Sequence, residues 1–546
     1  MSEPLHWWKE IVIYQIVVSS FLDTNGDGQG DLDGVIARLD YLKWIGVDAF
    51  WLTPIYPSPM HDLGYDVNDY TAVNPQFGSL EDFDRLVAQA HQREMKIILD
   101  WVPNHTSDEH PWFVESRASR DNPKRDWYLW REGKIEQSEL SDTSPETRDR
   151  VQPPNNWLSV FGGSAWQWDE KTKQFYYHSF LESQPDLNWR NSEVRAAVFD
   201  AMRFWLNRGV DGFRVDAVSW LIKDDQLRDN PPNPNYNPDT DGPDQQVIPL
   251  YTWDQPQVHE ITAEMRRVVD EFDGRMLAGE LVLPIDGVVT YYGNDKQPEL
   301  HLPLNLHLTW TDWTAEELSQ VIESYQQHLP QHGWPTWTIS THDFPRVAAR
   351  VLGEQTRVAA MLLLTLGGTP THYYGEEIGM QGVPIPPQEA RDPQGQRIGR
   401  NRDPGRTPMQ WDGDPNAGFT DGRPWLPISD DSQTANVAAQ SEDPHSLLTL
   451  YRRLMKLRRE QPVLVHGELE VISREGPLLS YRRSGEQGNL LMILNLGSEP
   501  QTYCLDIEAV GEGGPRLLMS TFLDRENELL QETVSLRPDE GVILIL

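Results

Sequence analysis

An arginine and an aspartate stand two residues apart in the stretch VDGFRVDAVSW, which spans residues 210–220. Its apolar residues favour a β-strand, and side chains alternate between the two faces of a strand. Arg214 and Asp216 therefore project from one face, while Phe213 and Val215 project from the other. A buried ion pair opposite an apolar face is costly. The pair is thus either a structural salt bridge or part of a reactive site.

Two more acidic residues stand at the ends of predicted strands. Glu280 lies near the end of RMLAGELVLP (275–284), and Asp343, preceded by His342, ends WTISTHDFPR (337–346). A lone acid at a strand end usually caps a helix or a turn. Three such acids, two of them with a basic neighbour, are harder to explain structurally. Carboxylates on opposite sides of a scissile bond are what glycoside hydrolysis requires, one ionised as nucleophile and one protonated as acid.

The neighbours of these carboxylates predict which one is ionised. Arg214 beside Asp216 favours the charged form of that aspartate, whereas crowding by other acids favours the protonated form of Glu280. We therefore expect Asp216 to be the nucleophile and Glu280 to be the general acid/base.

The rest of the chain predicts the scaffold that brings these residues together. Strand-like runs alternate with amphipathic helices such as 80–95 and 194–209, which is typical of a parallel α/β architecture. The number of strand candidates is that of a (β/α)8 TIM barrel, in which the active site lies at the C-terminal ends of the strands. These candidates lie at 11–21, 47–56, 96–105, 210–216, 275–284, 300–308, 337–346 and within 357–377.

Two segments interrupt this alternation, and a third follows it. Residues 106–184 are rich in Trp, Asn and Pro with little periodicity, which indicates an inserted domain B. An excursion rich in Pro, Asp and Gly covers about 379–441. Short alternating apolar runs over 461–546 predict a C-terminal antiparallel β domain. The catalytic barrel is therefore expected over 1–105 and 185–460.

Composition excludes several classes of partner. Lysine plus arginine number 47 against 84 for aspartate plus glutamate, a formal net charge of −37, which argues against nucleic acid and against anionic membranes. The single Cys504 excludes an internal disulfide framework and a cysteine-based zinc cluster. Neither a secretory signal nor a run of transmembrane length is evident. We expect a cytoplasmic protein that is a monomer or a homodimer.

An acidic, glycine-rich loop follows the first strand candidate. DTNGDGQGDLDG (23–34) places oxygen ligands at alternate or near-alternate positions, as a hard cation such as calcium requires. Its twelfth position is Gly34, so no bidentate glutamate closes an EF-hand, and an Asx-rich turn before a helix is the alternative. The candidate ligands are Asp23, Asn25, Asp27 and Asp31.

Several motifs together resemble the α-amylase family of glycoside hydrolases, in particular its oligo-1,6-glucosidase and α-glucosidase branch. The resemblance covers nearly the whole chain. The motifs, in chain order, are DWVPNH (100–105), QPDLN (184–188), GFRVDAV (212–218), GEL (279–281), THD (341–343) and GRTPMQWD (405–412).

The resemblance implies a fold and a role for each site residue. It implies a (β/α)8 barrel with a B domain inserted after the third strand and a C-terminal β-sandwich. Asp343 becomes a third acid that binds the sugar hydroxyls in the transition state, beside Asp216 and Glu280. The implied substrate-binding residues are Tyr65, His105, Arg214, His342, and an Asp66–Arg406 pair at the blind end of the pocket.

The same resemblance implies a metal and a substrate class. Gln29, through its carbonyl, joins the four candidate ligands in a structural Ca²⁺ site, where Mg²⁺ is the alternative; no organic cofactor is implied. Ala217, the residue after the nucleophile, favours α-1,4 over α-1,6 linkages in α-glucosides and malto-oligosaccharides. The expected activity is that of a retaining, exo-acting α-glucosidase. The alternatives are a transglucosidase or isomerase, such as a sucrose isomerase or trehalose synthase, a non-catalytic transporter subunit, and a carbohydrate-binding or storage protein.

The chain departs from the branch's pattern near the barrel mouth. One interpretation is neutral change at packing positions. The other is an altered pocket wall or acceptor site, specialised or engineered for an unusual aglycone or for transglycosylation. The departing residues are Val17, Val18, Val282, Thr341, Phe344, Thr371 and His372.

Overall fold

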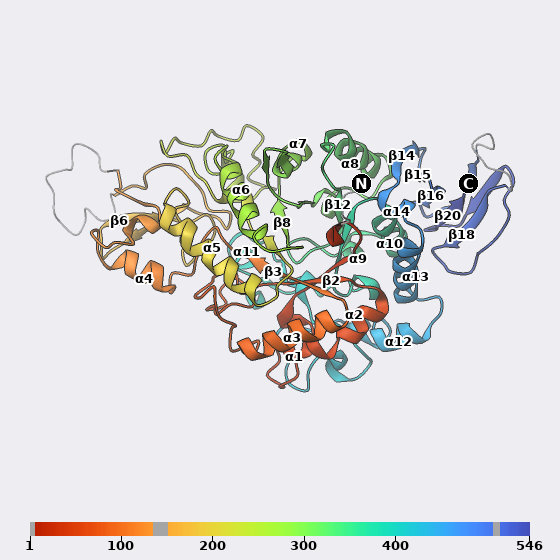
Figure 1. Ribbon diagram of the computed structural model, residues 1–546, viewed down its shortest axis with the longest axis horizontal. Helices are drawn as coiled ribbons and strands as arrows, with labels where there is room; N and C mark the ends of the chain where they lie inside the picture. Colours follow the sequence, from red (N-terminus) through yellow and green to blue (C-terminus); the bar gives the residue numbers. More distant parts are fainter. Residues whose placement is uncertain (1–5, 135–150, 506–513) are drawn as a thin grey trace.

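A parallel barrel forms the centre of the molecule (Figure 1). The computed structural model describes residues 6–134, 151–505 and 514–546. Its largest sheet has the order β11-β8-β7-β3-β2-β1-β13-β12, and every pairing in it is parallel. The predicted fold class is confirmed. The strands are β1 (Ile13–Ile16), β2 (Ala49–Leu52), β3 (Lys96–Trp101), β7 (Gly212–Val215), β8 (Met276–Leu281), β11 (Leu302–Asn305), β12 (Thr336–Thr338) and β13 (Thr369–Tyr373).

A side chain joins the two edge strands of this sheet. The Thr336 hydroxyl on β12 donates to the Pro303 carbonyl on β11 at 2.8 Å and accepts from the Asn305 N–H at 2.9 Å. The Thr336 hydroxyl thus bonds two backbone groups of β11 that would otherwise pair with the backbone of a neighbouring strand. This contact nearly closes the barrel between β11 and β12.

Helices between the strands cover the outside of the barrel. Helix α3 begins with a capping box between Ser79 and Asp82 and buries Phe83 and Leu86 against the barrel. The main helices are α1 (Leu32–Ala37), α2 (Leu39–Ile45), α3 (Leu80–Gln92), α5 (Ser192–Asn207), α6 (Val258–Val269), α8 (Ala315–His328), α10 (Gln355–Thr365) and α13 (Leu447–Glu460).

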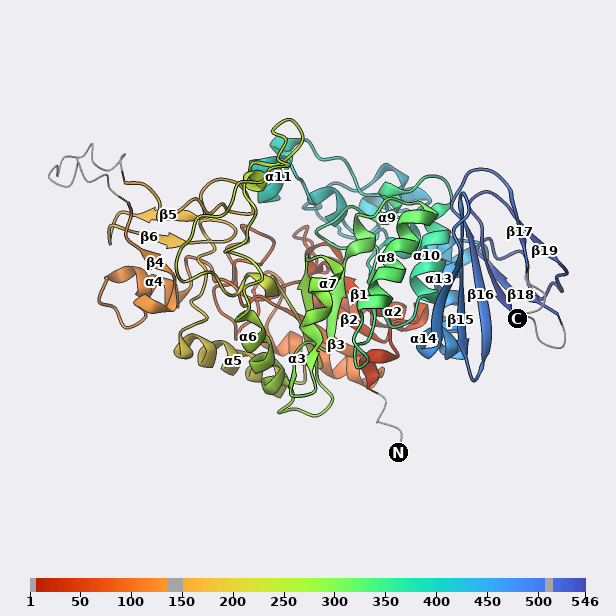
Figure 2. The same cartoon turned by 90° about the horizontal axis from the view of Figure 1, so that it is seen from above.

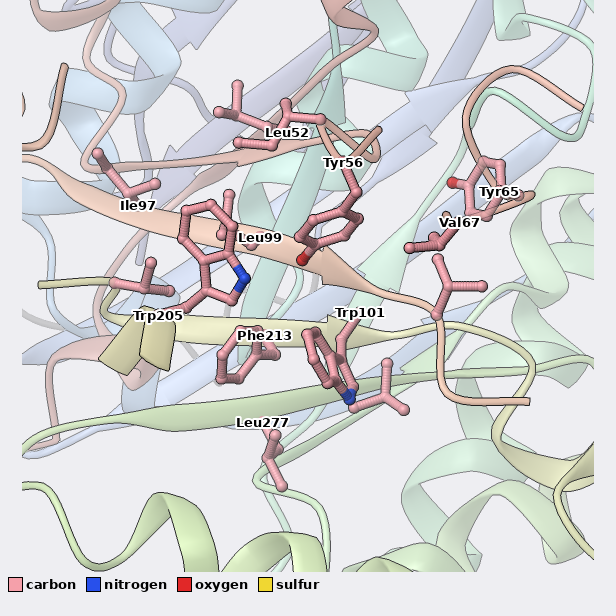
Figure 3. Packing of buried hydrophobic residues seen from close by; sticks show 14 of the residues in the cluster. Leu52, Tyr56, Tyr65, Val67, Ile97, Leu99, Trp101, Trp205, Phe213 and Leu277 are labelled. Atoms are coloured by element: carbon pink, nitrogen blue, oxygen red, sulfur yellow. The ribbon is translucent and has the colours of Figure 1, made fainter. Parts of the chain in front are cut away.

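The two faces of each strand carry different side chains. Leu99 and Trp101 of β3 and Phe213 of β7 belong to the core between strands and helices, where Trp205 of α5 packs with them (Figure 3). Ile98, between them in β3, belongs instead to the cluster inside the barrel. Because side chains alternate, the inward face of β3 and β7 also carries Asp100, Arg214 and then Asp216. This arrangement places the charged residues where the barrel opens.

A small sheet and a helix follow β3. The sheet is antiparallel and has the order β4-β6-β5. Figure 2 shows this sheet together with α4 at one end of the molecule. Residues 135–150 of the predicted insertion, 106–184, lie outside the described residues. The aromatic residues of this region pack with one another, for example Trp157 on Trp166 with ring centroids 5.9 Å apart. The elements are α4 (Pro111–Ala118), β4 (Trp130–Arg131), β5 (Trp166–Asp169) and β6 (Gln174–Tyr177).

Antiparallel sheets form the opposite end of the molecule (Figure 2). One sheet has the order β14-β15-β16-β20-β18, and β17 pairs with β19 in a second. Within the predicted domain 461–546, residues 506–513 lie outside the described part. The strands are β14 (Glu468–Ser473), β15 (Leu478–Gly485), β16 (Gly488–Asn495), β17 (Gln501–Cys504), β18 (Arg516–Ser520), β19 (Thr533–Leu536) and β20 (Gly541–Ile545).

The excursion after β13 returns over the barrel mouth. It contains α11 (Pro393–Ile398), which begins with the Asp392 carboxylate accepting from the Gln394 N–H, and α12 (Val437–Glu442). Between them it brings Arg402 and Arg406 to the acids of the barrel. Among the described residues, no helix is long and apolar enough to cross a membrane.

Candidate active site

Arg214 holds three carboxylates together at the C-terminal end of the barrel. Its Nη1 lies 2.8 Å from Asp100 Oδ1 and 2.7 Å from Asp216 Oδ1, and its Nη2 lies 3.0 Å from Glu280 Oε2. The guanidinium also lies over the Trp51 ring, at 4.8 Å from its centroid. The three acids come from β3, from the residue after β7, and from β8. The fork geometry of arginine therefore fixes the two predicted catalytic carboxylates relative to each other.

A second arginine cluster lies around Asp343. Arg402 Nη1 is 3.0 Å and Arg406 Nη2 is 3.2 Å from Asp343 Oδ1. Arg402 also contacts Asp62 at 2.8 Å and Asp392 at 2.7 Å. The acid after β12 is thus tied through Arg402 to the loop after β2 and to the excursion.

A buried relay of neutral groups joins the two clusters. The Tyr65 hydroxyl donates to Asp100 Oδ2 at 2.8 Å and lies 2.6 Å from Nε2 of His342. The Gln15 amide donates to Nδ1 of His342 at 2.6 Å, so Nε2 holds the proton of the neutral ring. That N–H also faces Asp343 Oδ2, 3.2 Å away. His342 is therefore a fixed, uncharged donor.

Burial determines the direction of the pKa shift at the predicted nucleophile. Burial raises the pKa of Asp216 well above its usual value, Glu280 raises it further, and Arg214 opposes both. Arg214 by itself favours the ionised form of Asp216, as expected. The net shift of the Asp216 pKa is nevertheless upward, because burial and the neighbouring acids outweigh Arg214.

The pKa values of three neighbouring side chains, Asp100, Asp343 and His342, are also shifted. Burial raises the pKa of Asp100 to about 6 although Arg214 lowers it. Burial also acts to raise the pKa of Asp343, but His342, Arg402 and Arg406 outweigh it, and the pKa is lowered. Burial lowers the pKa of His342 well below its usual value. Asp343 is thus held ionised next to a neutral histidine.

Ala217 sits in a strained backbone conformation next to the acids. Its φ of 48° and ψ of 38° are left-handed, a region that costs a residue with a Cβ about 1–2 kcal/mol. In this conformation its N–H donates to Glu280 Oε2 at 3.0 Å. The turn therefore adds a backbone donor to Glu280, beside Arg214.

The predicted Asp66–Arg406 pair is not formed within the described residues. Asp66 is fully buried and accepts from the Ser58 hydroxyl at 2.7 Å and from the His61 N–H at 2.8 Å, which closes its own loop. Arg406 binds Asp343 and donates to the His342 carbonyl at 2.8 Å. The pair that joins the two loops is Asp62–Arg402. Each member stands four positions before the residue that the sequence predicted.

A large pocket connects these groups to the surface. Its volume is about 860 Å³, and both members of the Asp62–Arg402 pair line it. Arg214 and His342 line a small adjoining cavity beneath it, with Glu280 and Asp343. The predicted site residues that line the large pocket are Tyr65, His105, Asp216, Ala217, Glu280 and Asp343.

His105 is positioned by a buried ion pair that the sequence analysis did not identify. The Asn104 amide, next to it in the chain, donates to Asp186 Oδ2 at 3.0 Å and accepts from Lys223 Nζ at 3.0 Å. Lys223 also pairs with Asp186, and both side chains are almost fully buried. Asp186 belongs to the motif QPDLN, so that motif holds the inserted region to the end of β3.

The loop after the first strand folds as a series of Asx turns. Asp23 Oδ1 accepts from the Asn25 N–H at 3.0 Å, and Asp27 Oδ1 accepts from the Gln29 N–H at 2.8 Å. Asp31 accepts from Gly34 N–H at 2.7 Å and caps α1. Among the described residues, no group of three or more His, Cys, Asp or Glu is arranged to hold a metal ion. These hydrogen bonds form the Asx-rich turn that was the alternative, and the calcium site stays a prediction.

The departures near the barrel mouth separate into two groups. Val282 and Phe344 line the large pocket, and Thr341 lines the cavity beneath it. The others are buried away from the pocket; His372, for example, pairs with Glu377 at 2.9 Å behind the barrel strand. The buried departures are Val17, Val18, Thr371 and His372.

Comparison with known proteins assigns the family. Residues 15–467 match the model of the alpha-amylase catalytic domain. An oligo-1,6-glucosidase of Parageobacillus thermoglucosidasius is 37% identical over 98% of each chain, and an alpha-glucosidase of Schizosaccharomyces pombe is 35% identical over 99% of this chain and 98% of its own. A solved alpha-glucosyl transfer enzyme superposes with a TM-score of 0.90 at 36% identity, over 99% of this chain and 100% of its own. The chain therefore belongs to the alpha-amylase family of glycoside hydrolases.

Proposed function

We propose that the chain is a retaining, exo-acting α-glucosidase that acts on terminal α-linked glucose. The observation that carries this proposal is the contact of Arg214 with both Asp216, at 2.7 Å, and Glu280, at 3.0 Å, at the base of the large pocket. Two carboxylates so close that one guanidinium joins them leave little room for a water between them, which favours the retaining over the inverting geometry.

In the first step, the Asp216 carboxylate attacks the anomeric carbon of the bound glucose. Glu280 donates its proton to the glycosidic oxygen, which leaves with the aglycone as an alcohol. The products are a glucosyl ester on Asp216 and an ionised Glu280. Arg214 stabilises the carboxylate that carries negative charge at each stage, because it contacts both.

In the second step, Glu280 acts as a base toward an incoming water. It takes one proton while the water oxygen attacks the anomeric carbon and displaces Asp216. Glucose leaves with the α configuration, and both carboxyl groups return to their first state. Two inversions give net retention.

The proposed glucose subsite is the polar part of the pocket. Arg402 joins Asp62 and Asp343 at 2.8 and 3.0 Å, which supports a fixed set of charged groups for the hydroxyls of a terminal glucose. Because the Asp62–Arg402 contact joins the loop after β2 to the excursion at the wall of the pocket, it closes that side of the pocket and favours a chain end over a chain that passes through. This supports exo action.

The linkage preference that we propose is α-1,4 over α-1,6. It rests on the resemblance to the oligo-1,6-glucosidase and α-glucosidase branch, in which alanine after the nucleophile accompanies α-1,4 activity and valine accompanies α-1,6 activity; here that residue is Ala217. Four similar relatives are named oligo-1,6-glucosidases, so the rates on maltose and isomaltose decide the preference.

Glucosyl transfer is the second candidate function. The superposition on an alpha-glucosyl transfer enzyme supports it, as do the apolar Val282 and Phe344 in the pocket wall. The catalytic residues are the same for transfer, in which an alcohol replaces water in the second step.

Anomeric NMR of the products tests both candidates. The substrates are maltose, isomaltose, sucrose and an aryl α-glucoside. Free α-glucose as the first product, with maltose faster than isomaltose, is expected. New glucosides in place of free glucose would move the assignment to transfer or isomerisation. First release of β-glucose would refute the retaining mechanism.

A further inference from the structure

The ends of four consecutive barrel strands carry apolar side chains on one side of the mouth. In barrel order these strands are β7, β8, β11 and β12, the last two joined through Thr336. The acids Asp216, Glu280 and Asp343 stand at the ends of the same strands, and further polar groups of the pocket come from the loops after β2, β3 and β7 and from the excursion. The apolar side chains are Trp220 after β7, Val282 after β8, Trp310 after β11 and Phe344 after β12.

These side chains remain accessible although they are large and apolar. Val282 and Ile248, the latter from the loop after β7, line the large pocket and are 44% and 43% exposed. Trp310 does not line the pocket itself but packs against Phe344, which does, and is 41% exposed. Such exposure next to a cavity indicates a ligand surface more often than chance. The mouth beside Glu280 is therefore built to hold an apolar group.

Aromatic rings give this surface a defined shape. Trp220 stacks on Trp253 with centroids 6.0 Å apart and an interplanar angle of 21°. Phe344 packs against Trp310 with centroids 5.1 Å apart. Rings held by other rings lose little freedom when a ligand binds, and they present flat faces to it.

Several polar groups that line the same part of the pocket are already bonded to protein. The Asn233 amide donates to the Gln245 carbonyl at 2.9 Å, and Asp244 Oδ2 pairs with Arg400 at 3.1 Å, whereas the buried Asp244 Oδ1 has no hydrogen-bond partner among the described residues. The Ser219 hydroxyl accepts from the Trp253 indole at 2.6 Å. A sugar in this part would bury hydroxyls for which few directed partners are left, and each unpaired hydroxyl weakens binding.

We propose that the subsite for the leaving group takes an apolar aglycone, an aryl or alkyl group, in preference to a second sugar. The inference rests on the proposed function, because the leaving oxygen lies at Glu280 only if Glu280 is the acid. The group bonded to that oxygen then lies beside Val282, two residues farther along the chain, and Phe344, next to Asp343. Stacking and apolar burial, and not hydrogen bonding, provide its binding energy.

The test is a series of alkyl α-glucosides, from methyl through n-butyl to n-hexyl, compared with maltose. These alcohols differ little as leaving groups, so differences in kcat/KM report binding of the aglycone. Full burial of a methylene corresponds to about fourfold in kcat/KM. We expect at least a tenfold rise from methyl to butyl α-glucoside, and a butyl value above that of maltose.

Two variants and a control locate the effect. Phe344→Gln and Val282→Thr replace apolar side chains with polar ones, and Val282→Thr also keeps the side-chain size nearly constant. Each is expected to lower the ratio of kcat/KM for the butyl substrate to kcat/KM for the methyl substrate three- to tenfold. Leu250→Thr is the matched control, because Leu250 is 53% exposed and does not line the pocket.

Each outcome decides one point. A flat alkyl series, or a faster maltose reaction that Phe344→Gln leaves unchanged, would overturn the apolar subsite while leaving the glucosidase assignment intact. No release of glucose from any α-glucoside, methyl α-glucoside included, would overturn the proposed function and the inference with it.

Discussion

Replacing Lys223 with Met should loosen the inserted region and impair the site. The Lys223 and Asp186 side chains are 3% and 0% exposed, so the pair is fully desolvated. Burial lowers the pKa of Lys223, and Asp186 opposes that shift. Removing one member of such a pair leaves an uncompensated buried charge, at a cost of about 3–5 kcal/mol. Asp186 would retain only neutral donors, from Ser179 and Asn104.

Amide hydrogen exchange measures this cost where it arises. The Ser179 N–H donates to Asp186 Oδ1 at 2.7 Å and reports opening of this contact. A loss of 3–5 kcal/mol corresponds to exchange roughly 10²- to 10³-fold faster or more, because each 1.4 kcal/mol is a factor of ten. We also expect kcat/KM to fall, because Asn104 holds His105 at the pocket.

Two further variants separate the ion pair from general damage. Adding Asp186→Asn to Lys223→Met should recover part of the protection, because the uncompensated charge is removed. Lys173→Met is the control, since that lysine forms only an exposed pair with Glu170 at 2.8 Å in the same region. Exchange at Ser179 within threefold of the wild type in Lys223→Met would refute the reasoning.

Three other predictions follow from the site and the loop after β1. Ala217→Gly should stabilise the protein by about 1 kcal/mol and Ala217→Val should destabilise it, because residue 217 has a left-handed φ of 48°. Equal denaturation midpoints for the three proteins would count against backbone strain at this residue. Because burial raises the pKa of Asp216, which must be ionised to attack, kcat/KM should fall with decreasing pH at an acidic limb well above the ordinary aspartate value near 3.9; a limb below pH 4 would contradict this. Chelation of calcium should lower the thermal midpoint if residues 23–31 bind it, with recovery on adding Ca²⁺; an unchanged midpoint would remove the metal from the account.

The strand-end acids could be predicted because periodicity fixes which face a side chain occupies. Arg214, Asp216 and Glu280 lie on the inward face, where Arg214 contacts both carboxylates. The strand limits were less accurate: the run 11–21 contains only β1, Ile13–Ile16, because Val18–Ser20 turns into a 3₁₀ helix. Apolar residues fill strand and turn alike where both are buried, so hydrophobicity does not show where a strand ends.

The Asp62–Arg402 pair could not be predicted from local spacing. Asp62 and Asp66 share one loop, as do Arg402 and Arg406, and each pair of positions offers the same chemistry. The choice depends on which carboxylate accepts hydrogen bonds from within its own loop, and Asp66 accepts from the Ser58 hydroxyl and the His61 N–H. The Lys223–Asp186 contact joins residues 37 positions apart and likewise needs the folded chain.

The roles of Asp216 and Glu280 are the central claim, and rescue by azide tests them most directly. Without Glu280 as base, azide attacks the glucosyl ester on Asp216; without Asp216, azide attacks the substrate itself. The account predicts α-glucosyl azide from Glu280→Ala acting on an activated aryl α-glucoside, and β-glucosyl azide from Asp216→Ala. Anomeric NMR distinguishes the two products. The opposite assignment of anomers to variants would contradict the account.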